Sequence, residues 1–178
     1  VTEDVQEEVG YTEEKGRKVF KPDGTYQKIA AVERHKNTGK IGVGIVKGFG
    51  LRGGAIASSV SHDSHNLIVI GDNDHDMYLA VQELLRTQGG YTLVENGQVF
   101  DTLPLPIMGL MSDAGYEKVN EKLARMIPKA HEMGIPEGFD PFITLSFMAL
   151  PVIPEIRITP RGVYLTQEDR MIQSPFDR

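Results

Sequence analysis

The stretch from Gly53 to Gly71 holds two apolar runs, each typical of a buried strand. Five consecutive polar residues, His62 to Asn66, separate the two runs. Burying a neutral polar group without a partner costs on the order of 2–7 kcal/mol. These side chains must therefore pair with one another, face water or serve a ligand, and this requirement limits how the chain can fold here.

The conformation of residues 62–66 decides which side chains act together. In an extended strand, residues two apart share a face, so Asp63 would act with His65, and His62 with Ser64. If the segment turns instead, both imidazoles can converge on one ligand or ion. The alternative is a polar turn whose side chains only cap backbone groups, which Asp, Ser and Asn do routinely. Two histidines and an acid within four residues are more than a turn needs, and both interpretations stay open.

Composition limits the classes of protein to consider. The chain has 178 residues, of which 40% are apolar and 25% charged, as expected for one soluble globular domain. Its net charge of -6 argues against a nucleic-acid partner, which needs a basic face. The absence of cysteine excludes disulfides and thiolate metal sites. No apolar run approaches the roughly 20 residues of a membrane span and no signal peptide opens the chain, so we expect a cytoplasmic protein without a membrane partner.

The first half of the chain divides into an arm and the start of a sheet. Residues 1–24 are acidic and predict a linker or arm, while residues 25–178 predict a single domain. Residues 26–34 are a probable strand. In residues 39–54, glycines alternate with Ile41, Val43 and Ile45, which indicates a strand that another backbone or a ligand approaches closely.

The second half predicts two helices, a hairpin and further strands. Asp72-Asn73-Asp74 offers caps for a helix with an inward stripe of Met77, Ala80, Val81, Leu84 and Leu85. Asn96-Gly97 predicts a two-residue hairpin turn between residues 91–95 and 98–103. A second helix should start at Ser112 or Asp113 and be kinked or broken at Pro128.

Residues 142–150 are almost continuously apolar, typical of a strand buried on both faces, with a short buried helix as the alternative. The methionines, Met108 and Met111 among them, are expected to fill the core or its edge. The predicted fold class is α+β: one domain with mixed or antiparallel sheets of six to eight strands packed with two main helices.

Familiar catalytic motifs are missing. Residues 48–53 match the dinucleotide pattern G-x-G-x-x-G, but that pattern requires a helix at its last glycine, and a strand-like run follows here. This argues against an oxidoreductase. No H-x-H, H-E-x-x-H or G-x-S-x-G occurs, so a self-contained hydrolase site cannot be assembled from known motifs.

Several segments nevertheless carry a resemblance to a known family. They are Glu33-Arg34-His35, GKIGVGIVKGFGLRGGAIASSVSHDSHNLIVIG (39–71), Leu103-Pro104-Leu105-Pro106-Ile107 with Gly109-Leu110-Met111-Ser112, and DPFITLSFMALPVIPEIRIT (140–159). Together they resemble the C-terminal domain of bacterial-type adenine deaminase, of the amidohydrolase superfamily, over about residues 26–160. The resemblance implies a hydrolase of purine salvage and adenine catabolism. In the complete enzyme a divalent metal (manganese, iron or zinc) in a (β/α)₈ barrel activates the water that converts adenine to hypoxanthine and ammonia.

The resemblance implies that this chain lacks the barrel, which needs about 250 residues. The expected partners are that barrel domain and adenine, with a homo-oligomer as a further option. We expect His62, Asp63 and His65 to support catalysis, and Ser61, Asn66 and Glu33 to contact substrate. No residue of this chain is expected to bind metal.

Two alternatives remain from the sequence. The chain is either a fragment of such an enzyme or a stand-alone relative of its last domain, and the missing initial methionine fits a fragment or a trimmed end equally well. The competing function is a non-catalytic binding or assembly module, in which the polar segment stabilises an interface only.

Overall fold

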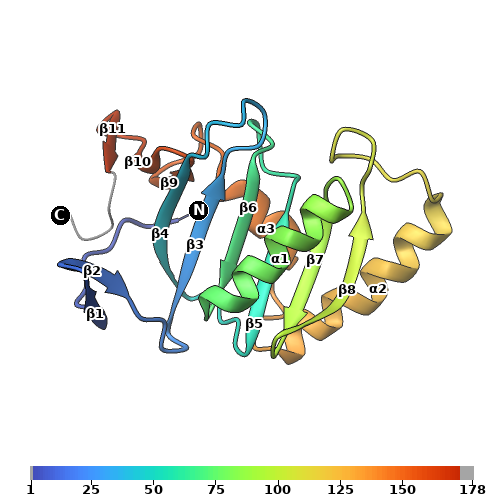
Figure 1. Ribbon diagram of the computed structural model, residues 1–178, viewed down its shortest axis with the longest axis horizontal. Helices are drawn as coiled ribbons and strands as arrows, with labels where there is room; N and C mark the ends of the chain where they lie inside the picture. The colour runs from blue at the N-terminus through green and yellow to red at the C-terminus, as the bar shows by residue number, and fades with distance from the viewer. Residues whose placement is uncertain (1, 173–178) are drawn as a thin grey trace.

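A six-stranded antiparallel sheet forms the centre of the computed structural model, which describes residues 2–172 (Figure 1). Its strands follow the order β4-β3-β6-β5-β7-β8. Their bounds are β3 Tyr26–Val32, β4 Ile41–Lys47, β5 Gly54–Ser58, β6 Leu67–Gly71, β7 Gly90–Glu95 and β8 Gln98–Pro104. A hairpin of β1 (Tyr11–Glu14) and β2 (Arg17–Phe20) precedes it, and β9 (Ile156–Thr159), β10 (Gly162–Leu165) and β11 (Arg170–Ile172) form a third sheet.

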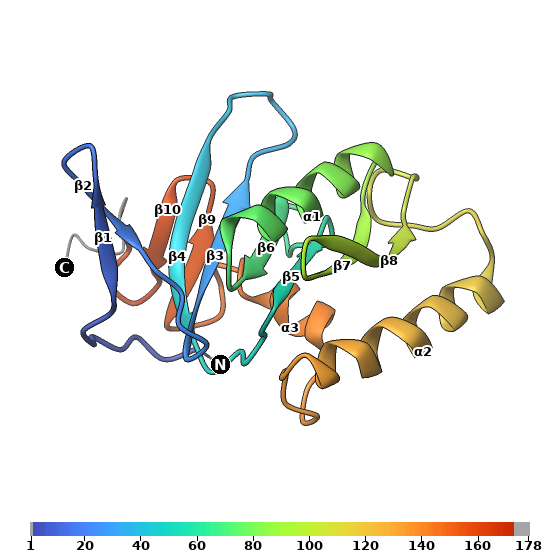
Figure 2. The ribbon, with the colours of Figure 1, turned by 60° about the horizontal axis from the view of Figure 1, so that its bottom comes forward.

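The central sheet is covered on both faces. Helix α1 (Asp74–Arg86) lies on one face, and α2 (Tyr116–Glu132), α3 (Pro141–Phe147) and the β9–β11 sheet lie on the other (Figure 2). Alternate strand residues therefore enter two separate cores: Ile29 and Ala31 pack into the larger core, while Ala30 packs into the smaller core beneath α1. The predicted α+β class with antiparallel sheets in a single domain is confirmed.

Two features predicted from short stretches of sequence are confirmed: the start of α1 and the hairpin between β7 and β8. The Asn73 side chain caps α1 by accepting a hydrogen bond of 2.8 Å from the Asp76 backbone N–H. Met77, Ala80 and Leu84 are buried as predicted, whereas Leu85 is exposed, because it lies beyond the edge of the buried stripe. Asn96 and Gly97 have φ of 49° and 79°, the left-handed values that a two-residue hairpin turn requires.

The alternating glycines of β4 do admit another backbone. A Cβ atom at Gly42 would lie 1.8 Å from the Thr159 carbonyl oxygen and 2.6 Å from the Gly162 nitrogen. Gly44 faces side chains instead of backbone: its Cβ atom would lie 3.2 Å from Val163 and 3.4 Å from Ile158. The predicted close approach is confirmed, and its partner is the β9–β10 hairpin.

The apolar run at residues 142–150 is not a strand, so the first interpretation was wrong and the helical alternative is correct. Asp140 caps α3 by accepting hydrogen bonds of 2.9 Å from the backbone N–H groups of Phe142 and Ile143. Pro141 occupies the first turn, where its missing N–H costs nothing. Phe142 and Leu145 are buried three residues apart, while Phe147 is 42% exposed.

Helix α2 also differs from its prediction. It begins at Tyr116, after Gly115, and continues through Pro128 to Glu132. Met126 and Ala130, on either side of the proline, are fully buried, and this packing offsets the lost backbone hydrogen bond. Tyr116, the first residue of α2, is exposed.

The structure contains more elements than were predicted. The β1–β2 hairpin lies within the segment expected to be an arm, and β9 and β11 were not anticipated. The predicted boundary between an arm and the domain at residues 24 and 25 stays a prediction. Among residues 2–172, no helix has both the length and the apolar character needed to cross a membrane.

We predict that Gly42→Ala destabilises the domain, because the added methyl group would overlap the Thr159 carbonyl. Overpacking of this kind typically costs about 1–3 kcal/mol, and backbone cannot move aside as a flexible side chain can. Gly138→Ala is the matched control, since nothing lies within 4 Å of its new Cβ atom. Urea denaturation would measure both variants, and equal stabilities would contradict the close approach of β9–β10.

Candidate functional site

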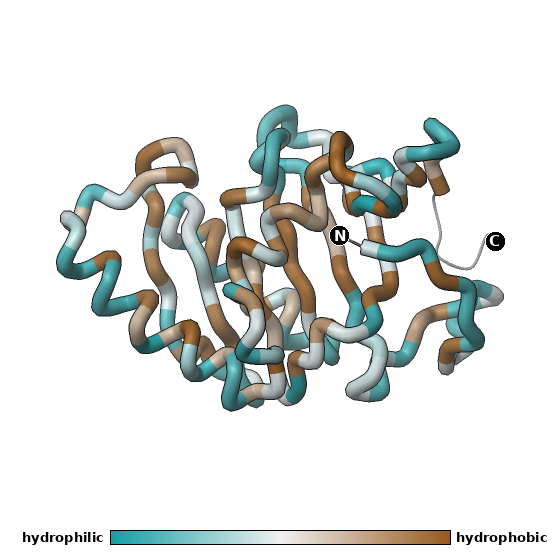
Figure 3. Tube along the Cα trace, turned by 180° about the vertical axis from the view of Figure 1, so that it is seen from behind, coloured by the Kyte–Doolittle hydropathy of each residue, from teal (hydrophilic) through white to brown (hydrophobic). Residues whose placement is uncertain are grey.

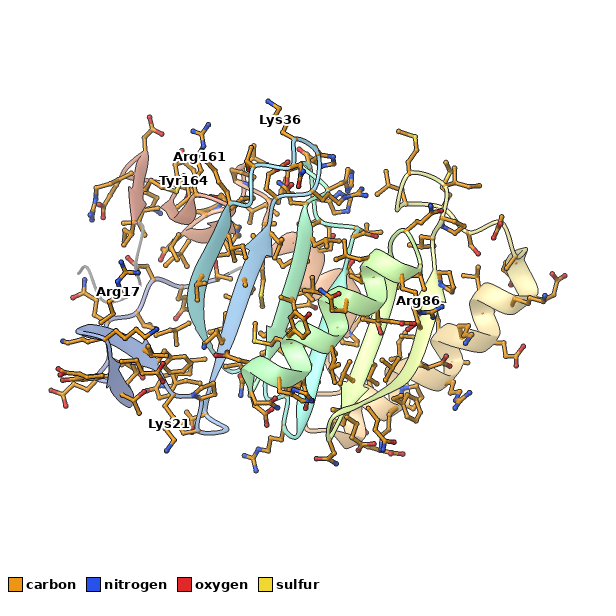
Figure 4. The ribbon with its side chains drawn as sticks, in the orientation of Figure 1. Arg17, Lys21, Lys36, Arg86, Arg161 and Tyr164 are labelled. Atoms are coloured by element: carbon orange, nitrogen blue, oxygen red, sulfur yellow. The ribbon has the colours of Figure 1, made fainter. Side chains whose placement is uncertain are left out.

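Antiparallel pairing brings three loops to one edge of the central sheet. Strands β3, β5 and β8 end at this edge, and β4, β6 and β7 begin there. The loops are residues 33–40, 59–66 and 105–115, and they lie at the top of Figure 1. Lys36, labelled in Figure 4, marks the same edge. This edge therefore gathers the residues that the sequence singled out.

Residues 61–66 form a turn, which we call the histidine turn. The His65 backbone N–H donates to the Ser61 carbonyl at 2.6 Å, and the Ser61 N–H donates to His65 Nδ1 at 3.4 Å. His65 adopts a φ of 49°, a left-handed conformation that histidine tolerates better than most residues. The centroids of the His62 and His65 rings consequently lie 5.5 Å apart, in an edge-to-face arrangement. The two imidazoles converge, as expected for a turn and not for an extended strand.

Helix α3 supports the histidine turn from the side. The His62 N–H donates to the Ser146 carbonyl at 3.3 Å, and the His62 ring stacks on Phe147 with centroids 5.2 Å apart. Asp63 is exposed, and its Oδ1 lies 4.0 Å from His62 Nδ1. The two rings thus form a partly exposed aromatic surface with a carboxylate at its rim.

Hydrogen bonds from Arg34 connect the histidine turn to the end of β3 and to the loop that contains Met108. Its Nε donates to the His65 carbonyl and its Nη2 donates to the Met108 carbonyl at 2.9 Å. Its backbone N–H donates to Asn66 Oδ1 at 3.3 Å. His35 adds a contact of 2.6 Å between its Nε2 and the Ser64 carbonyl. The turn is therefore held in place by two residues from the end of β3.

The electrostatic surroundings keep His65 neutral. Burial lowers the pKa of His65, and the positive charges that His62 and Arg34 can carry lower it further, while Asp63 opposes the shift. Because the Ser61 N–H points at Nδ1, this geometry assigns the ring proton to Nε2. His65 can therefore present an N–H donor at neutral pH.

The predicted substrate-contact residues separate into two groups. Ser61 and Asn66 are buried in the histidine turn; Ser61 Oγ has no hydrogen-bond partner among the described residues, and neither has the nearby Ser146 Oγ. Glu33 instead closes its own loop, where its carboxylate accepts hydrogen bonds from the backbone N–H groups of His35, Lys36 and Thr38 and from the Thr38 hydroxyl. These bonds lower the pKa of Glu33 to about 2.

Sequence analysis missed four residues of this site: Arg34, His35, Ser146 and Phe147. Arg34 lies in the Glu33-Arg34-His35 segment that contributes to the family resemblance, but the sequence assigned it no role. Ser146 and Phe147 reach the turn from α3, more than 80 positions further along the chain. Within residues 2–172, no group of three or more His, Asp or Glu side chains is arranged to hold a metal ion.

We predict that the loop of residues 33–40 loosens in acid. Glu33 has a folded-state pKa of about 2, below its unfolded value near 4.5, so its stabilisation is complete above pH 4.5 and is lost as the pH falls toward 2. The protection of the Thr38 amide, measured as its hydrogen-exchange rate relative to the intrinsic rate at the same pH, should fall across that window. In Glu33→Gln the exchange should be fast already at neutral pH; an unchanged, slow Thr38 amide in that variant would contradict the capping role.

Comparison with known proteins places these observations in a family. The family model described as adenine deaminase C-terminal domain matches residues 1–170. A protein named adenine deaminase from Desulfitobacterium hafniense (strain Y51) is 58% identical over 154 residues, covering 86% of this chain and 27% of that relative. Those from Nitratidesulfovibrio vulgaris (strain DP4) and Bacillus subtilis (strain 168) are 54% and 49% identical, each covering 82% of this chain and 25% and 26% of the relative. The chain thus spans about a quarter of the length of these curated relatives.

Proposed function

The chain belongs to the adenine deaminase C-terminal domain family, and we propose that it is the C-terminal domain of an enzyme that hydrolyses adenine to hypoxanthine and ammonia. The observation that carries this proposal is the family match over residues 1–170, together with relatives named adenine deaminase of which the matched segment makes up only about a quarter. The expected place of the enzyme is the cytoplasm, in purine salvage and adenine catabolism.

In this proposal the metal chemistry belongs to the rest of the polypeptide. The described residues offer no cluster that fits a metal ion. A divalent metal (manganese, iron or zinc) would be held by the catalytic barrel, where it would supply the activated water. The contribution of this chain lies in the side chains at one edge of its sheet.

We propose that the histidine turn faces the catalytic domain near the entrance of the active site. His62, Asp63 and His65 would support catalysis there. Ser61, Asn66 and Glu33 would contact the substrate. A purine presents ring nitrogens that accept hydrogen bonds, and the neutral His65 has Nε2–H to donate. Because Glu33 uses its carboxylate within its own loop, it is the least supported member of this set.

A non-catalytic binding or assembly module is the second candidate. The observation in its favour is that much of the turn is satisfied locally: Arg34 binds the His65 carbonyl, His35 contacts the Ser64 carbonyl, and Asn66 Oδ1 accepts from the Arg34 N–H. A turn that only stabilised an interface would need these bonds and the acceptor at His65 Nδ1, but it would not need the His62 imidazole.

We predict that His62→Ala and His65→Ala, each made in the full-length parent enzyme, lower kcat/KM for adenine. Loss of an orienting hydrogen bond or a proton relay typically lowers the rate about 10²–10⁴-fold. The melting temperature should change little, because both rings lie on a loop. His75→Ala is the control, since His75 is exposed and lies near the Asn96-Gly97 turn at the opposite edge of the sheet. Near-normal kinetics in both variants, or activity lost only through unfolding, would favour the binding module.

We predict that the isolated 178-residue chain folds but releases no ammonia from adenine, because about three quarters of the relatives' length is missing from it. Circular dichroism would establish folding, and an ammonia assay would measure deamination. Ammonia release that persists after contaminating enzyme is excluded would show that the chain carries its own catalytic site.

A further inference from the structure

The loop of residues 107–111, which we call the methionine loop, is unusually apolar for an exposed segment. Met108 is 75% exposed, Met111 54% and Ile107 43%. The prediction that Met108 and Met111 fill the core or its edge is therefore wrong. Single exposed apolar side chains are common, but adjacent ones mark contact surfaces. Figure 3 shows this loop, seen from behind, as a hydrophobic projection at the same edge as the histidine turn.

The methionine loop is preformed. Ile107 and Met111 exchange two backbone hydrogen bonds of 3.2 Å, and the Leu110 N–H donates to the Ile107 carbonyl at 3.1 Å. The buried Ser59 hydroxyl donates to the Gly109 carbonyl at 2.5 Å. Met108 adopts a φ of 59°, a left-handed conformation that is unfavourable for its side chain. The loop therefore holds Met108 in an unfavourable backbone conformation, and this conformation leaves its apolar side chain exposed to water.

Arg34 joins the methionine loop to the histidine turn. One guanidinium donates to both the His65 and the Met108 carbonyls. A Cβ atom at Gly109 would lie 2.6 Å from Arg34 Nη1, so the arginine packs directly against the loop backbone. The two segments, more than 40 positions apart in the sequence, are thus fixed side by side as one surface.

We propose that the methionine loop and the histidine turn together form the docking surface for the remainder of the same polypeptide, with Met108 and Met111 as its apolar anchors. The proposal rests on the proposed function, since it takes the parent enzyme to be longer than this chain. The choice of this partner rests on length: about three quarters of each relative lies outside the matched region, so a much larger part of the same polypeptide is tethered to this domain. Flexible methionine side chains suit contact with an irregular apolar surface.

The first test uses photo-cross-linking in the full-length parent protein. A benzophenone amino acid would replace Met108 in one variant and Tyr78 in a control; Tyr78, on α1, is 61% exposed and lies away from the loop. After irradiation, mass spectrometry should find intramolecular cross-links from position 108 to residues that precede this domain, and few from position 78. Cross-links from position 108 to a second copy, no cross-links, or equal yields from both positions would overturn the proposal.

The second test places a charged side chain on the proposed docking surface. Met108→Glu should open the docked surface and accelerate hydrogen exchange of residues 61–66 and 107–111 at least tenfold in the full-length protein, because a buried unpaired carboxylate is unfavourable. Tyr78→Glu should leave that exchange unchanged, and unchanged exchange in Met108→Glu would overturn the proposal. Neither readout depends on adenine turnover, so a failure of docking can be distinguished from a failure of the proposed deaminase activity.

Discussion

Antiparallel pairing of the six strands β4-β3-β6-β5-β7-β8 determines at which edge of the central sheet each connecting loop lies. Because neighbouring strands run in opposite directions, the ends of β3, β5 and β8 share an edge with the starts of β4, β6 and β7. Loops that are far apart in the sequence therefore meet, and Arg34, two residues beyond β3, is within reach of two of them. A guanidinium presents several donors in a fixed plane, and this allows one side chain to bind the carbonyls of His65 and Met108 together.

Much of the fold could be predicted because it depends on interactions between residues that are close together in the sequence. The cap at Asn73, the Asn96-Gly97 turn and the alternating glycines around Gly42 each depend on a few neighbouring residues, and the structure agrees with all three. Residues 142–150 were harder, because hydrophobicity alone does not separate a buried strand from a short buried helix. The decisive signal was the Asp140-Pro141 pair, which caps and begins α3.

The site was predictable only in part, because its members come from distant segments. The sequence placed His62 and His65 in one polar segment and left open whether they would converge. It could not show that Phe147 lies beneath His62, since that contact depends on where α3 packs. Nor could it separate Met126, which is fully buried, from Met108, which is held outward by a loop. A methionine gives the same compositional signal in both places; Met126 is buried because α2 packs into the larger core, whereas hydrogen bonds of the loop backbone hold Met108 outside it.

The hydrogen bonds within the histidine turn show which of its groups are satisfied locally. The groups that are not satisfied locally are the ones that call for a function. Local hydrogen bonds account for the carbonyls of Ser64 and His65 and for Asn66 Oδ1, so these acceptors need no outside partner. They do not account for two imidazoles whose centroids are 5.5 Å apart, one of which has a pKa lowered by burial and by its positive neighbours. Nor do they account for the stacking of His62 on a half-exposed Phe147. The His65 ring also accepts the Ser61 N–H at its Nδ1, so the His65 Nε2–H and the His62 ring are the parts of this turn that point to a partner surface or a substrate.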